Sequence, residues 1–273
     1  MPPVVSGVLD HFADHAIDVP APANTTRHHV PSACGVCHAD RSPDALGAWL
    51  ATQWPGAAAR QARRLRLADA FDEDTAKDSA RPLLAVIVDA AEAPTLRGAA
   101  ALAFARRFGA VAGPALAPLL DSPGVLLRAK ACEALGLARA TTAATAVAAR
   151  LDDPSLRVRL AAALALKDMR DPRGEPALQR LADDPASSHL TIPHLELGQA
   201  RARRGDLEGA QRELTQAVRL APYHTDALVL LAGVAAQRGD LAEARARSAQ
   251  ALALEPHHKG ALDLSARLAR DPR

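Results

Sequence analysis

The chain has 273 residues, with 33 Lys and Arg against 31 Asp and Glu, so its formal net charge is +2 at pH 7. That balance gives no reason to expect nucleic acid or an anionic membrane surface as a partner. Hydrophobic residues make up 49% of the chain and aromatic residues only 3%, and the apolar positions are mostly Ala and Leu. This composition favours helices packed through small side chains, and no apolar run is long enough to predict a membrane span.

The first 33 residues contain five prolines and four histidines and show little helical periodicity. Prolines at this density favour extended, loop-like chain. A loop of this length is unusual in a compact domain unless it wraps another group. The histidines are candidate ligands for a metal held by this segment; they are His11, His15, His28 and His29.

The next feature is a C-x-x-C-H motif formed by Cys34, Gly35, Val36, Cys37 and His38. Two thiols on one short turn can each add to a vinyl group of haem, and the histidine that follows can supply an axial nitrogen to the iron. The motif therefore predicts covalent attachment of haem c at both cysteines, with the adjoining histidine as the proximal ligand.

The distal ligand has to come from outside the motif. We favour His15, because the neighbouring Asp14 could orient its ring. The alternatives, in order, are His29, His28 and His11.

Two other interpretations of the motif remain open. A thioredoxin-like redox pair requires a strand before the first cysteine, whereas proline-rich chain precedes this one. A zinc site needs two further strong ligands, which His28 and His29 could supply. The third cysteine, Cys132, lies in an apolar helical stretch and is expected to be a small buried core residue.

A helix is predicted directly after the motif. Ser42 is a typical N-cap, followed by Pro43 in the first turn and Asp44 near the positive end of the helix dipole. Pro55-Gly56 ends the helix. Apolar side chains recur along it at helical spacing, and its tryptophans could pack on a haem edge or join this segment to the next helices; they are Leu46, Trp49, Leu50 and Trp54. Residues 1–56 are therefore predicted to form the c-type haem-binding segment.

Residues 57–80 read as an Arg-rich helix with a polar connection, and a repeat follows over 81–185, where prolines recur about every 30 residues. Similar helices follow the turns, so that Arg128 aligns with Arg159, and these arginine-bearing faces are expected to be solvated. The pattern resembles HEAT-like repeats of the short PBS-lyase type, whose helix pairs bury their apolar faces only by stacking. We assign residues 57–186 to a HEAT-like domain.

A second repeat, of 34 residues, follows over 191–256, where Gly205-Asp206-Leu207 recurs as Gly239-Asp240-Leu241. The small residues and the terminal proline of each copy match the tetratricopeptide pattern, and residues 259–270 add a capping helix. We assign residues 187–273 to this domain. Histidines near the repeat ends are expected at the surface; they are His189, His194, His224, His257 and His258.

The chain as a whole resembles a family of exported multihaem c-type cytochromes with C-terminal HEAT-like and tetratricopeptide repeats. In that family a haem motif followed by Met-Pro precedes an Asp-His segment running into Val-Pro, then Pro-x-Ala-Cys-x-x-Cys-His-x-Asp and a Trp-containing helix. The same features occur here in order, at Met1-Pro2, Asp14-His15, Val19-Pro20, residues 31–40, and Trp49 with Trp54.

The resemblance implies that Met1 is an internal methionine after a lost haem motif, and that upstream haem domains belong to the same protein. His15 is then also a candidate ligand of an upstream haem. This chain departs from the family pattern because it contains no upstream haem motif. Haem c is normally attached outside the bacterial cytoplasm, so a periplasmic or extracellular location is expected, although the N-terminus lacks the basic and apolar regions of a secretory signal.

The predicted fold is all-α, an α-solenoid with an N-terminal, loop-rich haem segment. The predicted function is electron transfer, with a redox partner protein or upstream haem domains, and with a protein or peptide ligand on the solenoid. One alternative is a non-haem interaction scaffold whose cysteines hold zinc or nothing. Another is the non-catalytic C-terminal part of a multihaem oxidoreductase. No nucleophile triad, P-loop or dinucleotide fingerprint predicts an enzyme in this chain alone.

Overall fold

The computed structural model describes residues 3–6, 10–13, 21–29, 31, 33–72 and 79–270. The chain divides into two compact units, Met1–Phe108 and Gly109–Arg273. The division falls inside the predicted HEAT-like domain, and the boundaries predicted at residues 56 and 186 remain predictions.

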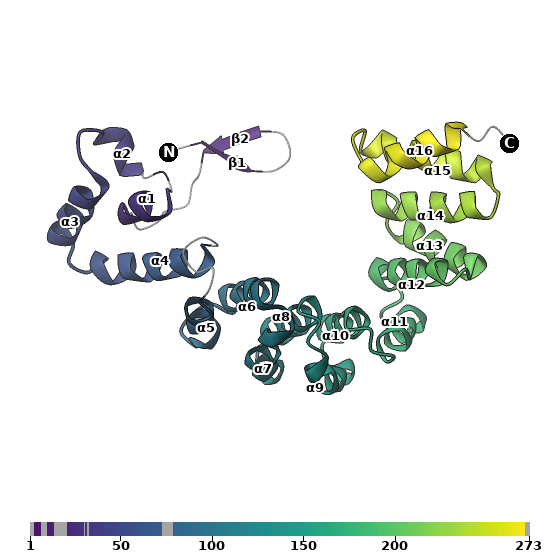
Figure 1. Ribbon diagram of the computed structural model, residues 1–273, viewed down its shortest axis with the longest axis horizontal. Helices are drawn as coiled ribbons and strands as arrows, with labels where there is room; N and C mark the ends of the chain where they lie inside the picture. Colours follow the sequence, from purple (N-terminus) through teal and green to yellow (C-terminus); the bar gives the residue numbers. More distant parts are fainter. Residues whose placement is uncertain are drawn as a thin grey trace. The chain divides into compact units, whose positions relative to one another are not determined.

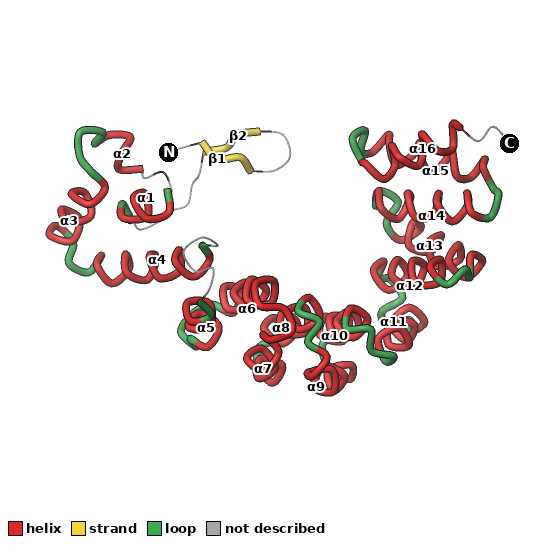
Figure 2. The backbone as a smooth tube through the Cα atoms, viewed as in Figure 1, coloured by secondary structure: helices red, strands yellow, loops and turns green. Residues whose placement is uncertain are grey.

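The N-terminal unit begins with a short hairpin that the sequence analysis did not anticipate. Strand β1 (Pro3–Ser6) pairs antiparallel with β2 (Asp10–Ala13), and Val4 lies opposite Phe12. Four-residue strands are too short for an alternating pattern to stand out in the sequence. The helical solenoid is therefore preceded by a two-stranded hairpin where extended loop was expected (Figure 2).

Helices make up the rest of the described N-terminal unit (Figure 1). They are α1 (Ala23–His28), α2 (Ala33–Cys37), α3 (Pro43–Gln53), α4 (Ala57–Phe71), α5 (Arg81–Val88) and α6 (Pro94–Phe108). Helix α3 begins as predicted, because the Ser42 side chain accepts a hydrogen bond from the main-chain N–H of Ala45. Its residues Leu46 and Leu50 are buried, whereas Trp49 and Trp54 are exposed.

The turn between α5 and α6 is fastened to α4 by a buried carboxylate. Glu92 accepts hydrogen bonds from Nε and Nη2 of Arg63, at 3.0 and 2.5 Å, and from Arg66 at 2.8 Å. These hydrogen bonds lower the pKa of Glu92, so this buried side chain stays ionised and paired.

The C-terminal unit is helical throughout its two parts, and the first part mixes short helices with longer ones. The first part comprises η1 (Gly109–Ala112), α7 (Gly113–Leu116), η2 (Ala117–Asp121), α8 (Val125–Leu137), η3 (Thr141–Ala143), α9 (Ala144–Ala148), η4 (Ala149–Asp152), α10 (Leu156–Asp168) and α11 (Gly174–Asp183). The second part comprises α12 (Thr191–Arg203), α13 (Leu207–Leu220), α14 (Thr225–Gln237), α15 (Leu241–Leu254) and α16 (Lys259–Arg270).

Helices α8 and α10 pack closely because a glycine removes the side chain between them. A Cβ atom at Gly136 would lie 2.6 Å from Cα of Ala165. Further along, Ala163 of α10, Leu178 and Leu181 of α11 and Leu197 of α12 share one apolar cluster. The core of the first repeat type therefore continues into the second.

Glycine and aspartate define the turns of the second repeat type. Gly205 and Gly239 adopt φ values of 82° and 83°, a left-handed conformation that glycine reaches without a Cβ penalty. The next residues, Asp206 and Asp240, cap α13 and α15 by accepting hydrogen bonds from main-chain N–H groups. The helices therefore reverse direction at the repeated glycines, and the aspartates add N-caps.

The last helix closes the stack. The buried face of α16 consists of Ala261, Leu264 and Leu268, and Arg267 lies on its exposed side. This arrangement fits the predicted capping helix. Over the described ranges, none of the helices combines the length and apolar character needed to cross a membrane.

Candidate functional site

The C-x-x-C-H motif forms one helical turn. Cys34 and Cys37 lie in α2, and their spacing of three residues places both side chains on the same side of the helix. The main-chain N–H of His38 donates to the carbonyl of Cys34 at 2.9 Å, so the histidine continues this turn. Cys34 is half-buried, and Cys37 and His38 are exposed. Two thiols and one imidazole are thus presented by a single short element.

An exposed apolar surface lies in the same segment of the chain. Val36, between the two cysteines, is 77% exposed. The rings of Trp49 and Trp54 meet edge to face, with their centroids 5.6 Å apart, and both remain substantially exposed. Contact of these tryptophans with a haem edge stays a prediction.

The alternative ligand His28 is engaged by carboxylates. Its Nε2 lies 2.9 Å from Asp69 and its Nδ1 2.5 Å from Asp72, and the side chain is only 5% exposed. His28 therefore links α1 to α4, and both of its ring nitrogens already have carboxylate partners.

Of the other three candidate distal ligands, two lie within the described residues. His29 is exposed at the end of α1, with a φ value of 54°. His11 belongs to β2, where its backbone is opposite Val5. His15, the first choice, lies outside the described residues. Within the described ranges, no three His, Cys, Asp or Glu side chains are grouped so as to hold a metal ion.

Cys132 is separate from the motif. It lies on α8 with no exposed surface, and burial raises the pKa of its thiol to about 12. Because the thiolate is the nucleophile, we expect Cys132 to resist a maleimide reagent in the folded protein prepared without haem, while Cys37 reacts. Mass spectrometry of peptides after brief labelling at pH 7 would measure this, and denaturant should release Cys132. Equal labelling of Cys132 and Cys37 without denaturant would contradict it.

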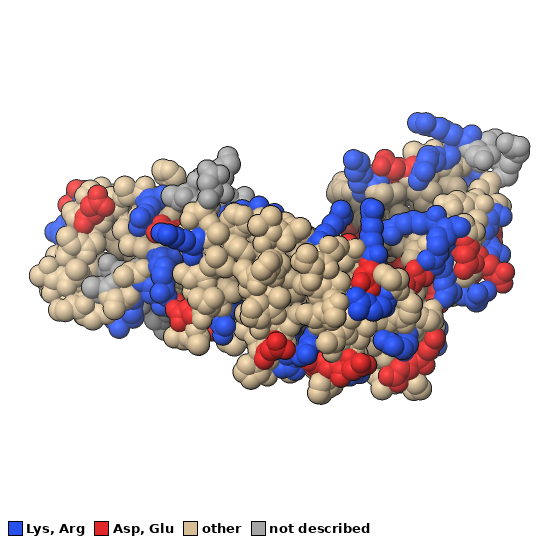
Figure 3. All heavy atoms as spheres, turned by 60° about the horizontal axis from the view of Figure 1, so that its bottom comes forward, with Lys and Arg blue, Asp and Glu red and all other residues tan. Residues whose placement is uncertain are grey.

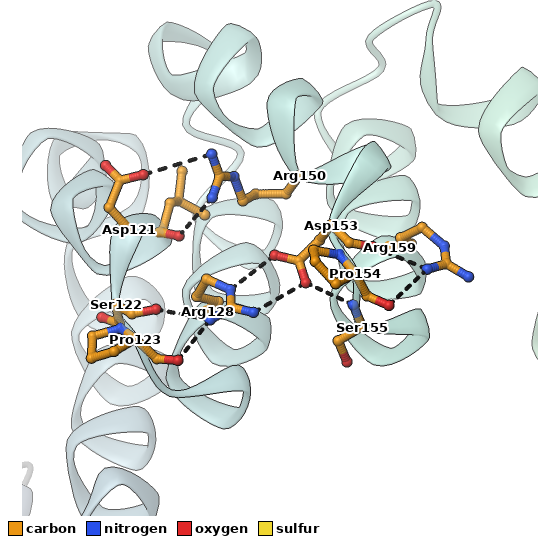
Figure 4. Close-up of polar contacts among 10 residues, drawn as sticks. Asp121, Ser122, Pro123, Arg128, Arg150, Asp153, Pro154, Ser155 and Arg159 are labelled. Atoms are coloured by element: carbon orange, nitrogen blue, oxygen red, sulfur yellow. Dashed lines mark hydrogen bonds and ion pairs between the residues drawn. The ribbon is translucent and has the colours of Figure 1, made fainter.

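The arginine that follows a HEAT turn forms hydrogen bonds that hold the turn in place, rather than extending into solvent. Arg128 of α8 donates from Nε and Nη2 to both carboxylate oxygens of Asp153, at 2.9 and 3.1 Å (Figure 4). Its Nη1 donates to the carbonyls of Ser122 and Pro123, each at 2.9 Å. Only 13% of the Arg128 side chain and 3% of the Asp153 side chain are exposed. The expectation that these faces are solvated is wrong at Arg128.

The next repeat reproduces part of this arrangement. Arg159 donates to the carbonyls of Asp153 and Pro154, at 3.0 and 3.1 Å (Figure 4). Arg150 reaches back to Asp121 of the preceding turn, at 3.6 Å. Arg128 thus joins two consecutive turns, because it binds the carbonyls of Ser122 and Pro123 in one turn and the carboxylate of Asp153 in the next.

Polar contacts also join the first helix pair of the second repeat type. The Nδ1 atom of His194 lies 2.7 Å from a Glu213 oxygen, and Arg201 contacts the other Glu213 oxygen at 3.1 Å. Arg201 in turn donates to Gln179 of α11 at 2.7 Å. His194 is buried, so its predicted surface position is wrong.

Comparison with known proteins assigns both repeat segments. Residues 113–190 match the family model of HEAT repeats, and residues 201–268 match the family model of tetratricopeptide repeats. The chain contains HEAT and tetratricopeptide repeats. The helical solenoid predicted from the sequence is thereby confirmed, and it is a protein-interaction scaffold. Neither family match includes Cys34–His38.

One solved structure similar to this chain is that of YrrB, described as a TPR protein with an unusual peptide-binding site. It is 22% identical, and the alignment covers 65% of this chain and 100% of that one, with a TM-score of 0.43. No curated protein matches the sequence.

Proposed function

We propose that the chain is an electron-transfer module in which one haem c, bound through Cys34 and Cys37, is carried by a repeat scaffold that binds a protein partner. The observation that carries the proposal is the single helical turn that places both thiols on one side, with His38 directly after them. This donor set matches the chemistry of covalent haem attachment and proximal ligation.

The residues around the motif fit such a group. Exposure of Cys37 and His38 leaves both accessible to a porphyrin, and Val36 adds apolar surface beside them. A bound haem would supply one-electron chemistry between ferric and ferrous iron. The chain's own task is then to hold the porphyrin by two thioethers and to fix the iron through His38.

The distal ligand remains a proposal. We retain His15 as the first choice, with His29 and His11 after it. His28 moves to last place, because binding iron would break its contacts with Asp69 and Asp72 and detach α1 from α4.

The scaffold suggests how the module is used. A protein or peptide ligand bound by the HEAT and tetratricopeptide repeats would bring a redox partner toward the haem segment, and upstream haem domains of a longer protein would supply electrons. On this proposal the protein acts in the periplasm or outside the cell, where haem c is attached. The chain would equally serve as the non-catalytic C-terminal part of a multihaem oxidoreductase.

A scaffold without haem is the second candidate, because the family matches cover only the repeats. In that case the motif would hold zinc or have no ligand. Covalent haem distinguishes the two candidates directly.

The test is export of the full chain together with a haem-maturation system. We expect a mass increase of one haem and the reduced absorption bands of a c-type cytochrome. Cys34→Ala combined with Cys37→Ala should abolish the covalent haem, whereas the control Cys132→Ala should retain it. A purified protein with neither the mass increase nor the bands would refute the haem proposal, and metal analysis would then decide between zinc and no ligand.

A further inference from the structure

An arginine occurs at the end of the first helix in each of four consecutive repeats of the C-terminal unit. Arg139 and Arg170 follow the C-caps of α8 and α10, with φ values of 50° and 59°. In α12 and α14 the C-cap itself is an arginine, and the left-handed position after it is glycine. We call this set the arginine edge; it consists of Arg139, Arg170, Arg204 and Arg238.

The backbone does not account for the first two of these arginines. A left-handed residue at this position favours glycine, because any Cβ atom crowds the neighbouring carbonyl. A cation near a helix C-terminus is favourable, but a side chain in the last turn or at the C-cap meets that requirement equally well, as Arg204 and Arg238 show. The reason for an arginine at 139 and 170 therefore lies in the side chain.

Three of the four side chains have no ion pair within the described part of the chain. Arg139, Arg170 and Arg238 are exposed, and no carboxylate of the described residues forms an ion pair with them. By contrast, Arg204 is held by two hydrogen bonds to Glu175, at 2.6 and 2.5 Å. Lys and Arg side chains, with acidic residues between them, are prominent over α10 to α16 in Figure 3.

Two of the four arginines line the same cleft of the repeat stack. Helices α8 and α10 are in close contact near their C-terminal ends, where Gly136 faces Ala165. Arg170 and Arg204 line one cleft of about 570 Å³ together with Lys167. The edge therefore continues from the HEAT repeats into the first tetratricopeptide repeat.

The acidic groups in this cleft are already engaged. Asp171 binds Arg173, and this hydrogen bond lowers the pKa of its carboxyl to about 2. The pKa of Glu175 is likewise lowered, first by its hydrogen bond from Arg204. The Nζ atom of Lys167 donates a hydrogen bond to a carboxylate oxygen of Glu196 at 2.7 Å. Among the described residues that line this cleft, Arg170 is the basic side chain without an ion pair.

We propose that the arginine edge binds an extended acidic segment of a partner protein. Helices α8 and α10, which precede Arg139 and Arg170, pack directly on each other, and helices in contact lie about 10 Å apart. An extended chain advances about 3.3 Å per residue. Acidic side chains three positions apart would therefore meet Arg139 and Arg170. The carboxylates between the arginines disfavour nucleic acid, whose backbone charge is continuous. The proposal rests on the scaffold part of the proposed function and does not depend on haem.

The test measures binding of the full chain to two labelled peptides of the same composition by fluorescence anisotropy. One has Glu at every third position of a proline-containing extended sequence, and the other has its Glu residues clustered. We expect the spaced peptide to bind more tightly and to lose affinity in high salt. Arg139→Gln with Arg170→Gln should weaken its binding about 100-fold, about tenfold for each lost charged hydrogen bond.

Two further variants separate binding from folding. Arg157, at the other end of α10, is also exposed and has no ion pair among the described residues, so Arg157→Gln should leave affinity unchanged. Arg139→Gly with Arg170→Gly should lose binding while its Tm stays level or rises, because glycine relieves the left-handed positions.

Unchanged affinity in either double variant, or equal binding of the two peptides, would overturn the proposal. Stronger competition by an oligonucleotide or inorganic phosphate than by unlabelled spaced peptide would also overturn it. None of these outcomes depends on haem.

Discussion

Replacement of Asp153 by alanine is expected to lower the free energy of unfolding of the repeat segment by about 2 to 3 kcal/mol. The side chain of Asp153 is almost fully buried and accepts two hydrogen bonds from Arg128 and one from the main-chain N–H of Ser155. Without it, the guanidinium keeps its two carbonyl partners but loses its counter-charge. We place the effect below that of a deeply buried pair, because water can reach this turn.

The neighbouring residue supplies a matched control. Asp152 has the same side chain but is exposed, and none of the described residues pairs with it. Asp152→Ala should therefore change stability by no more than about 0.5 kcal/mol. Urea unfolding followed by circular dichroism measures both variants. Equal destabilisation by the two substitutions would show that the Arg128–Asp153 pair does not fasten the turns.

The effect should also depend on pH. The pKa of Asp153 is lowered in the folded protein, first by the hydrogen bond from Arg128. A carboxyl with a lowered folded pKa stabilises the fold above its unfolded pKa, and this contribution is lost as the pH falls through the folded value. The difference in unfolding free energy between the wild type and Asp153→Ala should therefore become smaller as the pH falls below 3.8, the ordinary pKa of aspartate.

The repeats were predictable because their signals are local. Gly205 and Gly239 mark left-handed turns, and the Asp residues that follow them cap the next helices, so a few adjacent residues determine each element. Ser42 likewise predicted the start of α3. Such signals depend on backbone conformation and on hydrogen bonds within one turn, which a single sequence displays directly.

Contacts between distant residues were not predictable in the same way. Arg128 reads as a surface residue until Asp153, from the next repeat, is brought beside it. His194 follows the same rule, since its partner Glu213 lies on the next helix. His28 was the third of four candidate distal ligands in the sequence, and only the packing of α1 on α4 shows that both of its ring nitrogens contact carboxylates.

The candidate haem site likewise contains one part that is local in the sequence and one part that depends on tertiary structure. The thiols and the proximal histidine are consecutive in the chain, so C-x-x-C-H specifies them by itself. A distal ligand comes from a separate segment and depends on tertiary structure, for which spacing along the sequence provides no rule. The motif therefore gives three residues of the site, and the fourth must be found by experiment.

Gly136→Ala is expected to cost about 2 kcal/mol of unfolding free energy. The added Cβ would lie 2.6 Å from Cα and 2.9 Å from Cβ of Ala165, and because backbone rather than a flexible side chain is in the way, α8 and α10 must separate. Overpacking of this kind costs up to about 3 kcal/mol. Alanine's higher helix propensity returns about 1 kcal/mol.

Gly233 in α14 isolates the propensity term. It is also a helix-interior glycine, but a Cβ built there meets no atom within 4 Å. Gly233→Ala should therefore stabilise the protein by about 1 kcal/mol, opposite in sign to Gly136→Ala. Thermal and urea unfolding of both variants would show this. If both substitutions stabilised the protein, helices α8 and α10 would not be in close contact, and the continuity of the arginine edge across them would lose its structural basis.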